Sequence, residues 1–267
     1  MQSLVCMQQH HLKSNAFPHL HPCKRTATSY SSHTITQQVL NHASILSPSM
    51  ALSSNPKDLV NLRKQLAFYG AYHTNPVNVA IHIVGVPTII FGTECLLAAI
   101  GPVQAPEWAK PMLDSLSDAA PDIVSKYARL NWPALFAVSY WLYYTLLDHV
   151  AAILLLPIWA GLYFAVQYVA LDHPADLVKV GSIASAIGWI SQFYGHGVHE
   201  GRAPALLDNL LGAVVLAPFF VWLEVIFHLG YRPQLQKQLN NDIGKLVLEF
   251  RKGNKKASKE VAKGKAA

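Results

Sequence analysis

Five stretches of mostly apolar residues follow one another in the central and C-terminal parts of the chain. They cover residues 77–100, 133–147, 150–171, 177–194 and 210–229. A membrane-spanning helix needs about 20 mostly apolar residues, so the first, third and fifth stretches are long enough and the other two are short. The pattern predicts an all-α, polytopic helical membrane protein.

The residues around these stretches predict the other parts of the chain. Residues 1–50 are rich in Ser, Gln, Thr and His without an apolar period, so we expect a disordered leader or an extension before a start at Met50. Residues 51–236 would form the membrane domain and residues 237–267 a basic cytosolic tail.

Two shorter features are expected within the membrane domain. Asn55-Pro56 resembles a helix start, and the apolar positions after it predict a surface helix that ends near Gly70. Residues 101–132 read as a loop with one short amphipathic helix around residues 123–130, and Asn131-Trp132-Pro133 as an interfacial helix entry.

Basic residues near both ends of the membrane domain fix the expected topology. Arg63-Lys64 and the lysine-rich tail both favour the cytosolic side, which requires an even number of spans. We therefore expect about four transmembrane spans plus one re-entrant or broken helix. The broken element would be a short stretch, or two stretches fused around Asp148-His149.

Composition and charge support this class and exclude others. Hydrophobic residues make up 52% of the chain and charged residues only 13%, against about 25% charged residues in soluble domains. The net charge of +6 comes from the two ends, because residues 51–236 hold nine basic and twelve acidic residues. This distribution argues against nucleic-acid binding and favours contact with anionic membrane lipid. The three cysteines have no paired spacing, which excludes a disulfide framework.

Ionisable residues at membrane depth are candidates for function, and two histidine clusters qualify. His73 and His82 lie nine residues apart, which would put them on opposite faces of one unbroken helix. Asn75-Pro76 between them favours a bend and a new helix start, so the two imidazoles can converge.

The second cluster is the run from His196 to Glu200. On an α-helix His196, His199 and Glu200 would share one face and offer imidazole and carboxylate ligands together. Imidazole-rich sites suit iron, zinc or copper. The two clusters together predict a metal site near the membrane interface.

These residues carry a resemblance to a known family. The motif His73-x-Asn75-Pro76-x-Asn78-x-x-x-His82, followed by Gln192-Phe193-x-Gly195-His196-x-x-x-Glu200-x-Arg202-x-Pro204, resembles the membrane-bound, iron-dependent 2-hydroxy fatty acid dioxygenases of fatty acid α-oxidation. The resemblance extends over roughly residues 59–233, with both motifs in the expected order.

The resemblance implies an enzyme of the endoplasmic reticulum membrane that uses Fe(2+) and molecular oxygen to shorten a 2-hydroxy fatty acid by one carbon, as in phytosphingosine breakdown. It implies His73, His82 and His196 as iron ligands, with His199 as a further candidate at a position that is aromatic in some family members. From chemistry alone we add Glu200 and Arg202 as catalytic candidates, Arg202 as a partner of the substrate carboxylate or of Asp208.

Alternative interpretations are a membrane zinc hydrolase, a di-iron hydroxylase, and a non-enzymatic helical membrane organiser or transporter. A di-iron enzyme would be expected to carry more short-spaced histidine boxes, and a transporter an internal repeat. The ending Lys263-Gly264-Lys265-Ala266-Ala267 resembles a cytosolic dilysine retrieval signal, which adds to the expectation of endoplasmic reticulum residence.

Overall fold

The computed structural model describes residues 56–201 and 210–264, with side chains for residues 57–201 and 214–253. The described residues are all-helical and contain no strand, only an isolated bridge between Pro102 and Asn131, so the expected all-α class is confirmed. The helices are α2 (Pro56–Leu59), α3 (Leu62–Tyr72), α4 (Pro76–Ala98), α5 (Lys110–Ala119), α6 (Asp122–Tyr127), α7 (Trp132–Leu147), α8 (His149–Asp172), η1 (Pro174–Asp176), α9 (Leu177–Tyr194), η2 (Gly195–Glu200), α10 (Leu210–His228) and α11 (Pro233–Gly264). The leader, Arg202, Asp208 and Lys265 lie outside the described residues.

Each apolar stretch forms one long helix, and side-chain caps set where three of them begin. The Asn75 side chain accepts hydrogen bonds from the N–H groups of Val77 and Asn78 at the start of α4. Asn131 caps α7 and Asp148 caps α8 in the same manner. These caps satisfy first-turn N–H groups that have no partner within the helix. The expected break at Asn75-Pro76 is therefore confirmed.

Two sequence-based expectations differ from the structure. The single surface helix is two helices, because Asn61 accepts a hydrogen bond from the Lys64 N–H and so starts α3 after a break. α3 is also largely buried. In the loop, α6 matches the expected short helix, but α5 precedes it and was not expected. Lys110 and Pro111 at its first turn, and Asp114 and Asp118 farther along, obscured its apolar period.

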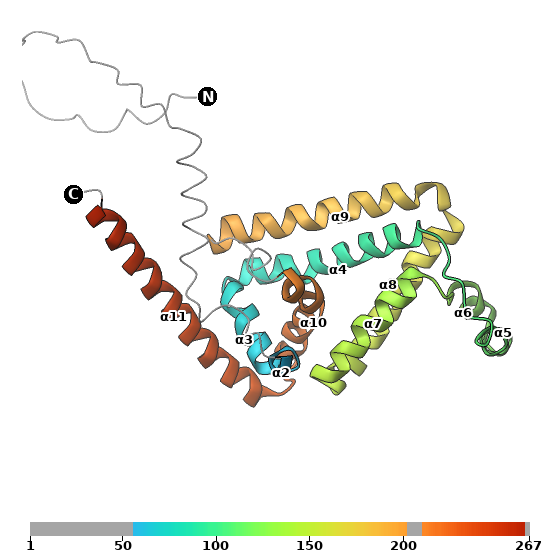
Figure 1. Ribbon diagram of the computed structural model, residues 1–267, viewed down its shortest axis with the longest axis horizontal. Helices are drawn as coiled ribbons and strands as arrows, with labels where there is room; N and C mark the ends of the chain where they lie inside the picture. The colour runs from blue at the N-terminus through green and yellow to red at the C-terminus, as the bar shows by residue number, and fades with distance from the viewer. Residues whose placement is uncertain (1–55, 202–209, 265–267) are drawn as a thin grey trace, which may run out of the picture. The chain divides into compact units, whose positions relative to one another are not determined.

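α4 and α9 run side by side over most of their lengths (Figure 1). Glycines recur with a spacing of seven residues, at positions 85 and 92 of α4 and 181 and 188 of α9. A Cβ atom added at these glycines would contact the facing helix. At Gly92 it would lie 2.7 Å from the Gly181 carbonyl oxygen, and at Gly188 3.1 Å from the Gly85 carbonyl oxygen. Such close backbone approach is typical of helix pairs in membranes. This glycine-lined contact, the α4–α9 seam, fixes the register of the two helices.

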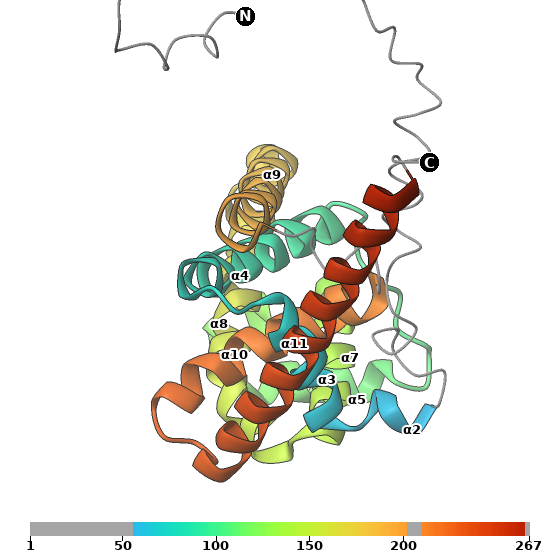
Figure 2. The ribbon, with the colours of Figure 1, turned by 90° about the vertical axis from the view of Figure 1, so that its left-hand side faces the viewer.

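The C-terminal helix α11 packs against α3 (Figure 2). Leu239 is buried in this contact, and Ile243 lies against Gly70. Arg63 of α3 forms an ion pair with Asp242 of α11 at 2.7 Å. The segment expected to be a tail is thus helical as far as Gly264, and part of it is packed.

Within the described part of the chain, two helices, α4 and α8, are long and apolar enough to cross a membrane. The adjoining parts of α10 and α11, 214–228 and 233–253, pass the same test jointly but are bent by 119° at their break, so the count is three only if this bent pair forms one span. The expected count of about four spans is not confirmed, since α7 has only 16 residues and α9 carries polar residues such as Lys179. Large apolar side chains are exposed on several helices, including Val84, Leu146 and Ile190. Apolar helices with such surfaces indicate membrane association.

Candidate metal centre

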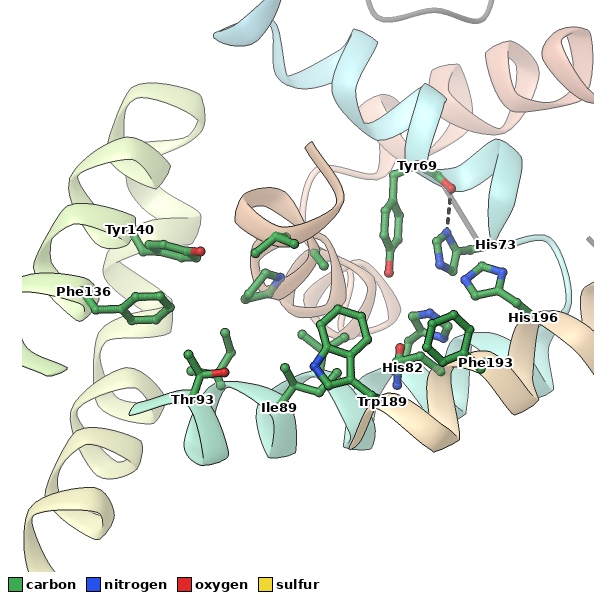
Figure 3. A pocket seen from close by; sticks show the side chains of 16 residues that line it. Tyr69, His73, His82, Ile89, Thr93, Phe136, Tyr140, Trp189, Phe193 and His196 are labelled. Atoms are coloured by element: carbon green, nitrogen blue, oxygen red, sulfur yellow. Dashed lines mark hydrogen bonds between the residues drawn. The ribbon is translucent and has the colours of Figure 1, made fainter. Parts of the chain in front are cut away.

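Three histidines from three separate elements meet at one point (Figure 3). His73 ends α3, His82 lies in the second turn of α4, and His196 lies in η2. One ring nitrogen from each can be chosen so that all three lie within 4.8 Å of one another. Their ring centroids are 4.5 to 4.9 Å apart. The convergence that the Asn75-Pro76 bend predicted is therefore present.

Backbone carbonyl groups orient two of these rings. His73 Nδ1 lies 2.8 Å from the Tyr69 carbonyl oxygen, and His82 Nδ1 lies 2.9 Å from the Asn78 carbonyl oxygen. A carbonyl oxygen only accepts, so each Nδ1 must be the protonated, donating nitrogen. In a neutral imidazole this leaves Nε2 unprotonated, so its lone pair can bind a metal, which is the usual arrangement for a histidine ligand.

Tyr69 adds a second constraint on His73. The two rings are stacked, with centroids 3.8 Å apart and an angle of 15° between their planes. Burial, and secondarily the nearby Glu224 carboxylate, raises the pKa of Tyr69 well above its ordinary value. The phenol therefore stays neutral and adds no negative charge of its own beside the three histidines.

The three histidines lie at the wall of a largely apolar cavity of about 140 Å³. Its wall is built from α3, α4, α7, α9, η2 and α10, and it extends from the histidines to Phe136 and Tyr140 of α7 (Figure 3). Ile89, Trp189 and Phe193 line the space between. A chain of methylene groups can lie there without exposing apolar surface to water.

Glu200 lies at the N-terminus of α4 and not in the group of three histidines. Its carboxylate accepts hydrogen bonds from the Asn75 backbone N–H at 2.7 Å and the Thr74 hydroxyl at 3.0 Å. The Asn78 side-chain amide donates to the same carboxylate at 3.3 Å. A negative charge at a helix N-terminus is favourable, so Glu200 joins η2 to the start of α4.

His199 is also not a member of the group of three among the described residues. Its ring lies against Tyr194, with centroids 5.5 Å apart, and its carbonyl oxygen accepts from the Asn75 side chain. The reason is local: residues 195–200 form a π-helical turn, in which residues three apart no longer share a face. The expectation that His196 and His199 lie on one face assumed α-helical geometry.

Sequence reasoning missed the supporting residues Tyr69 and Asn78, and also Gln192, which lines the cavity. Asn78 and Gln192 both stand within the quoted motifs, so the signal was available without a role attached to it. Tyr69 precedes His73 by four residues, and that spacing on a helix predicts proximity of the two.

The donor set fits a transition metal. Three imidazole nitrogens on converging rings, two of them held by backbone carbonyls, are ligands that suit iron, zinc or copper. Three protein ligands also leave coordination positions open for substrate, which is the pattern of catalytic rather than structural sites. His73, His82 and His196 are thus the residues that could hold the metal.

The fold and site define an all-helical, membrane-associated protein with a three-histidine centre in an apolar cavity. Residues 59–229 match the family described as Mpo1-like, 2-hydroxy-palmitic acid dioxygenase. The chain is 38% identical over 186 residues to the 2-hydroxy-palmitic acid dioxygenase MPO1 of Saccharomyces cerevisiae, which covers 69% of this chain and 91% of that protein. The chain therefore belongs to the Mpo1-like family, and its class is that of dioxygenase enzymes. No solved structure matches it significantly.

Proposed function

We propose that this chain is an Fe(II)-dependent dioxygenase that shortens 2-hydroxy fatty acids by one carbon. One 2-hydroxy acid and one O2 would give the acid that is one carbon shorter, CO2 and water. The four electrons that leave the substrate reduce O2 completely, so no external reductant is required. The three-histidine group at the wall of an apolar cavity carries the proposal.

Two independent lines support this function. The relative in Saccharomyces cerevisiae is named for a dioxygenase that acts on 2-hydroxy-palmitic acid. The geometry supplies ligands for a metal beside a space that suits an acyl chain. Three histidines also suit zinc, but a dioxygenase requires a metal that reacts with O2, which favours iron.

Each residue has a role in this proposal. His73, His82 and His196 hold the iron, and the bound iron supplies the reaction with oxygen. The apolar wall holds the acyl chain and excludes water from the reacting end. We assign Arg202, outside the described residues, to the substrate carboxylate, because a guanidinium pairs with a carboxylate in bidentate fashion.

We also propose a multi-pass position in the endoplasmic reticulum membrane and a role in phytosphingosine breakdown. Long-chain 2-hydroxy acids partition into membranes, so an enzyme embedded there meets them without carrying them through water. Extraction of the membranes with alkaline carbonate should leave the chain in the pellet, and protease protection of tagged chains should report how many segments cross.

The test of function uses the full chain, purified in detergent without chelator. We expect about one iron per chain, and O2 consumption with 2-hydroxypalmitic acid that yields pentadecanoic acid. Replacement of the iron by zinc should abolish O2 consumption. Zinc in the active preparation, or hydrolysis of an ester or amide without O2 uptake, would instead support a zinc hydrolase.

A further inference from the structure

Gln192 is a buried polar residue that the proposed mechanism does not yet use. It lies in α9, is 7% exposed, and lines the cavity with the three histidines. It precedes His196 by four residues on a continuous helical run, which puts the two on one face. On the facing helix its amide lies against Gly85, three residues after His82. Gln192 is therefore next to two proposed iron ligands.

The local contacts fix which end of the Gln192 amide faces which way. Nε2 donates a hydrogen bond to the Ser191 hydroxyl at 3.3 Å, and that hydroxyl in turn donates to the Gly188 carbonyl oxygen at 2.7 Å. Nε2 is also the amide atom nearest to Gly85, where a Cβ would overlap it. Gly85 thus leaves room for the amide within the α4–α9 seam.

The other end of the amide has no hydrogen-bond partner within residues 56–201 and 210–264. Oε1 of Gln192 is buried and accepts no hydrogen bond from any described residue. A buried carbonyl oxygen without a donor costs about 1–3 kcal/mol. Groups of this kind are rare in native proteins and commonly mark a place where a ligand or water supplies the missing partner.

We propose that Gln192 Oε1 accepts a hydrogen bond from the 2-hydroxyl group of the substrate and so selects 2-hydroxy fatty acids over unsubstituted ones. The inference rests on the proposed function and adds the residue that reads the hydroxyl. An amide oxygen can only accept, so it pairs with an O–H group and not with the substrate carboxylate. An unsubstituted acid would leave Oε1 unpaired, and such sites discriminate strongly against ligands that lack the donor.

The experiment compares the dissociation constants of 2-hydroxypalmitic acid and palmitic acid. They are measured without O2 on the full, iron-loaded chain in detergent, for the wild type and for Gln192→Met, which keeps length but removes the amide. The wild type should prefer the hydroxy acid. In Gln192→Met the affinity for 2-hydroxypalmitic acid should fall about tenfold, which is the equivalent of one lost hydrogen bond. Palmitic acid affinity and bound iron should not change.

Gln167→Met is the matched control. Gln167 in α8 is also buried, and its Nε2 has no hydrogen-bond partner in the described part of the chain, but it does not line the cavity. It should leave the ratio of the two affinities unchanged. Gly85→Ala should lower the preference for 2-hydroxypalmitic acid over palmitic acid, as Gln192→Met does, because the new methyl group displaces the Gln192 amide. This second variant is measured in place of Gln192→Met if Gln192→Met does not accumulate.

The outcomes separate the two proposals. The assignment of Gln192 is overturned if the affinity ratio is unchanged in iron-loaded Gln192→Met, even if the wild type oxidises 2-hydroxypalmitic acid. If Gln192→Met cannot be obtained, an unchanged ratio in Gly85→Ala overturns it in the same way. The proposed function is overturned if the wild type consumes no O2 with 2-hydroxypalmitic acid. If the preference for this acid over palmitic acid nevertheless falls in Gln192→Met, the recognition of the 2-hydroxyl group by Gln192 is still supported. An equal fall in Gln167→Met would make the effect one of packing and also overturn the assignment.

Discussion

At the residue scale, the centre depends on which ring nitrogen each histidine presents. The sequence predicted that His73 and His82 converge, because Asn75-Pro76 breaks the helix between them. It could not predict the tautomers, since those depend on the carbonyl oxygens of Tyr69 and Asn78 four residues earlier. Residue spacing alone could not separate His196 from His199 either, because the π-helical turn that distinguishes them has no clear signature in one sequence; only the family resemblance set His199 apart.

His196 and His199 give a direct test of the ligand set. We expect His196→Ala to lose most of its bound iron and its activity, because it removes one of three imidazole ligands. His199→Ala, three residues away on the same turn, should keep its iron and lose activity only in part. Iron content by elemental analysis and O2 uptake measure both. Equal iron loss in the two variants would make His199 a ligand after all.

Substitution of Glu200 distinguishes a structural role at the start of α4 from a catalytic role. Its carboxylate accepts from the Asn75 N–H and the Thr74 hydroxyl, so Glu200→Gln should weaken the link between η2 and α4 and lower stability by about 1 kcal/mol. Thermal unfolding in detergent gives the stability, and kcat is measured well below the melting temperature. A kcat that collapses while the melting temperature is unchanged would favour the catalytic role that the sequence alone indicated.

At the element scale, the α4–α9 seam sets the distance between His82 and His196. The hydrophobic pattern located both helices, but it gave no pairing between them. Glycines at positions 85 and 92 of α4 and 181 and 188 of α9 share a seven-residue spacing. This spacing indicates a close helix contact only when it is known that the two helices face each other. Tertiary packing therefore supplied what periodicity could not.

Gly188→Ala should separate these helices and loosen the metal site. Its Cβ would lie 3.1 Å from the Gly85 carbonyl oxygen and closer still to Ile89, so the backbones must move apart. We expect about a tenfold loss of iron affinity, as for changes in groups that orient metal ligands. Gly161→Ala is the control, because a Cβ there meets nothing within 4 Å. Equal iron affinities in the two variants would contradict the role of the seam.

At the scale of the whole described fold, two distant turns are joined by one carboxylate. Asp148, between α7 and α8, accepts hydrogen bonds from the Tyr231 hydroxyl at 2.8 Å and the Arg232 guanidinium at 2.6 Å, both at the turn between α10 and α11. Its side chain is only 4% exposed. The sequence marked Asp148-His149 as a break between helices, but not this link, because the partner lies more than eighty residues away.

This link makes stability depend on pH in a defined direction. Burial alone would raise the pKa of Asp148, but the Ala151 N–H, Tyr231 and Arg232 together lower it below its ordinary value of 3.8. The stability from Asp148 is therefore present above that ordinary value and is lost as the pH falls through the lower pKa of the folded state. Asp148→Asn should cost about 1–3 kcal/mol at pH 7, because a neutral amide leaves the three donors poorly paired.

The pH dependence distinguishes this charge effect from a loss of packing. We expect the melting temperature of the wild type in detergent to fall between pH 5 and about pH 3 more steeply than that of Asp148→Asn, which has no proton to take up at this position. Glu107→Gln is the control, because Glu107 pairs with Lys110 at an exposed site, and this substitution should leave the wild-type slope unchanged. Parallel slopes in the wild type and Asp148→Asn would mean that the ion pair contributes through shape alone, and the stability of the junction would then have to come from the apolar contacts around it.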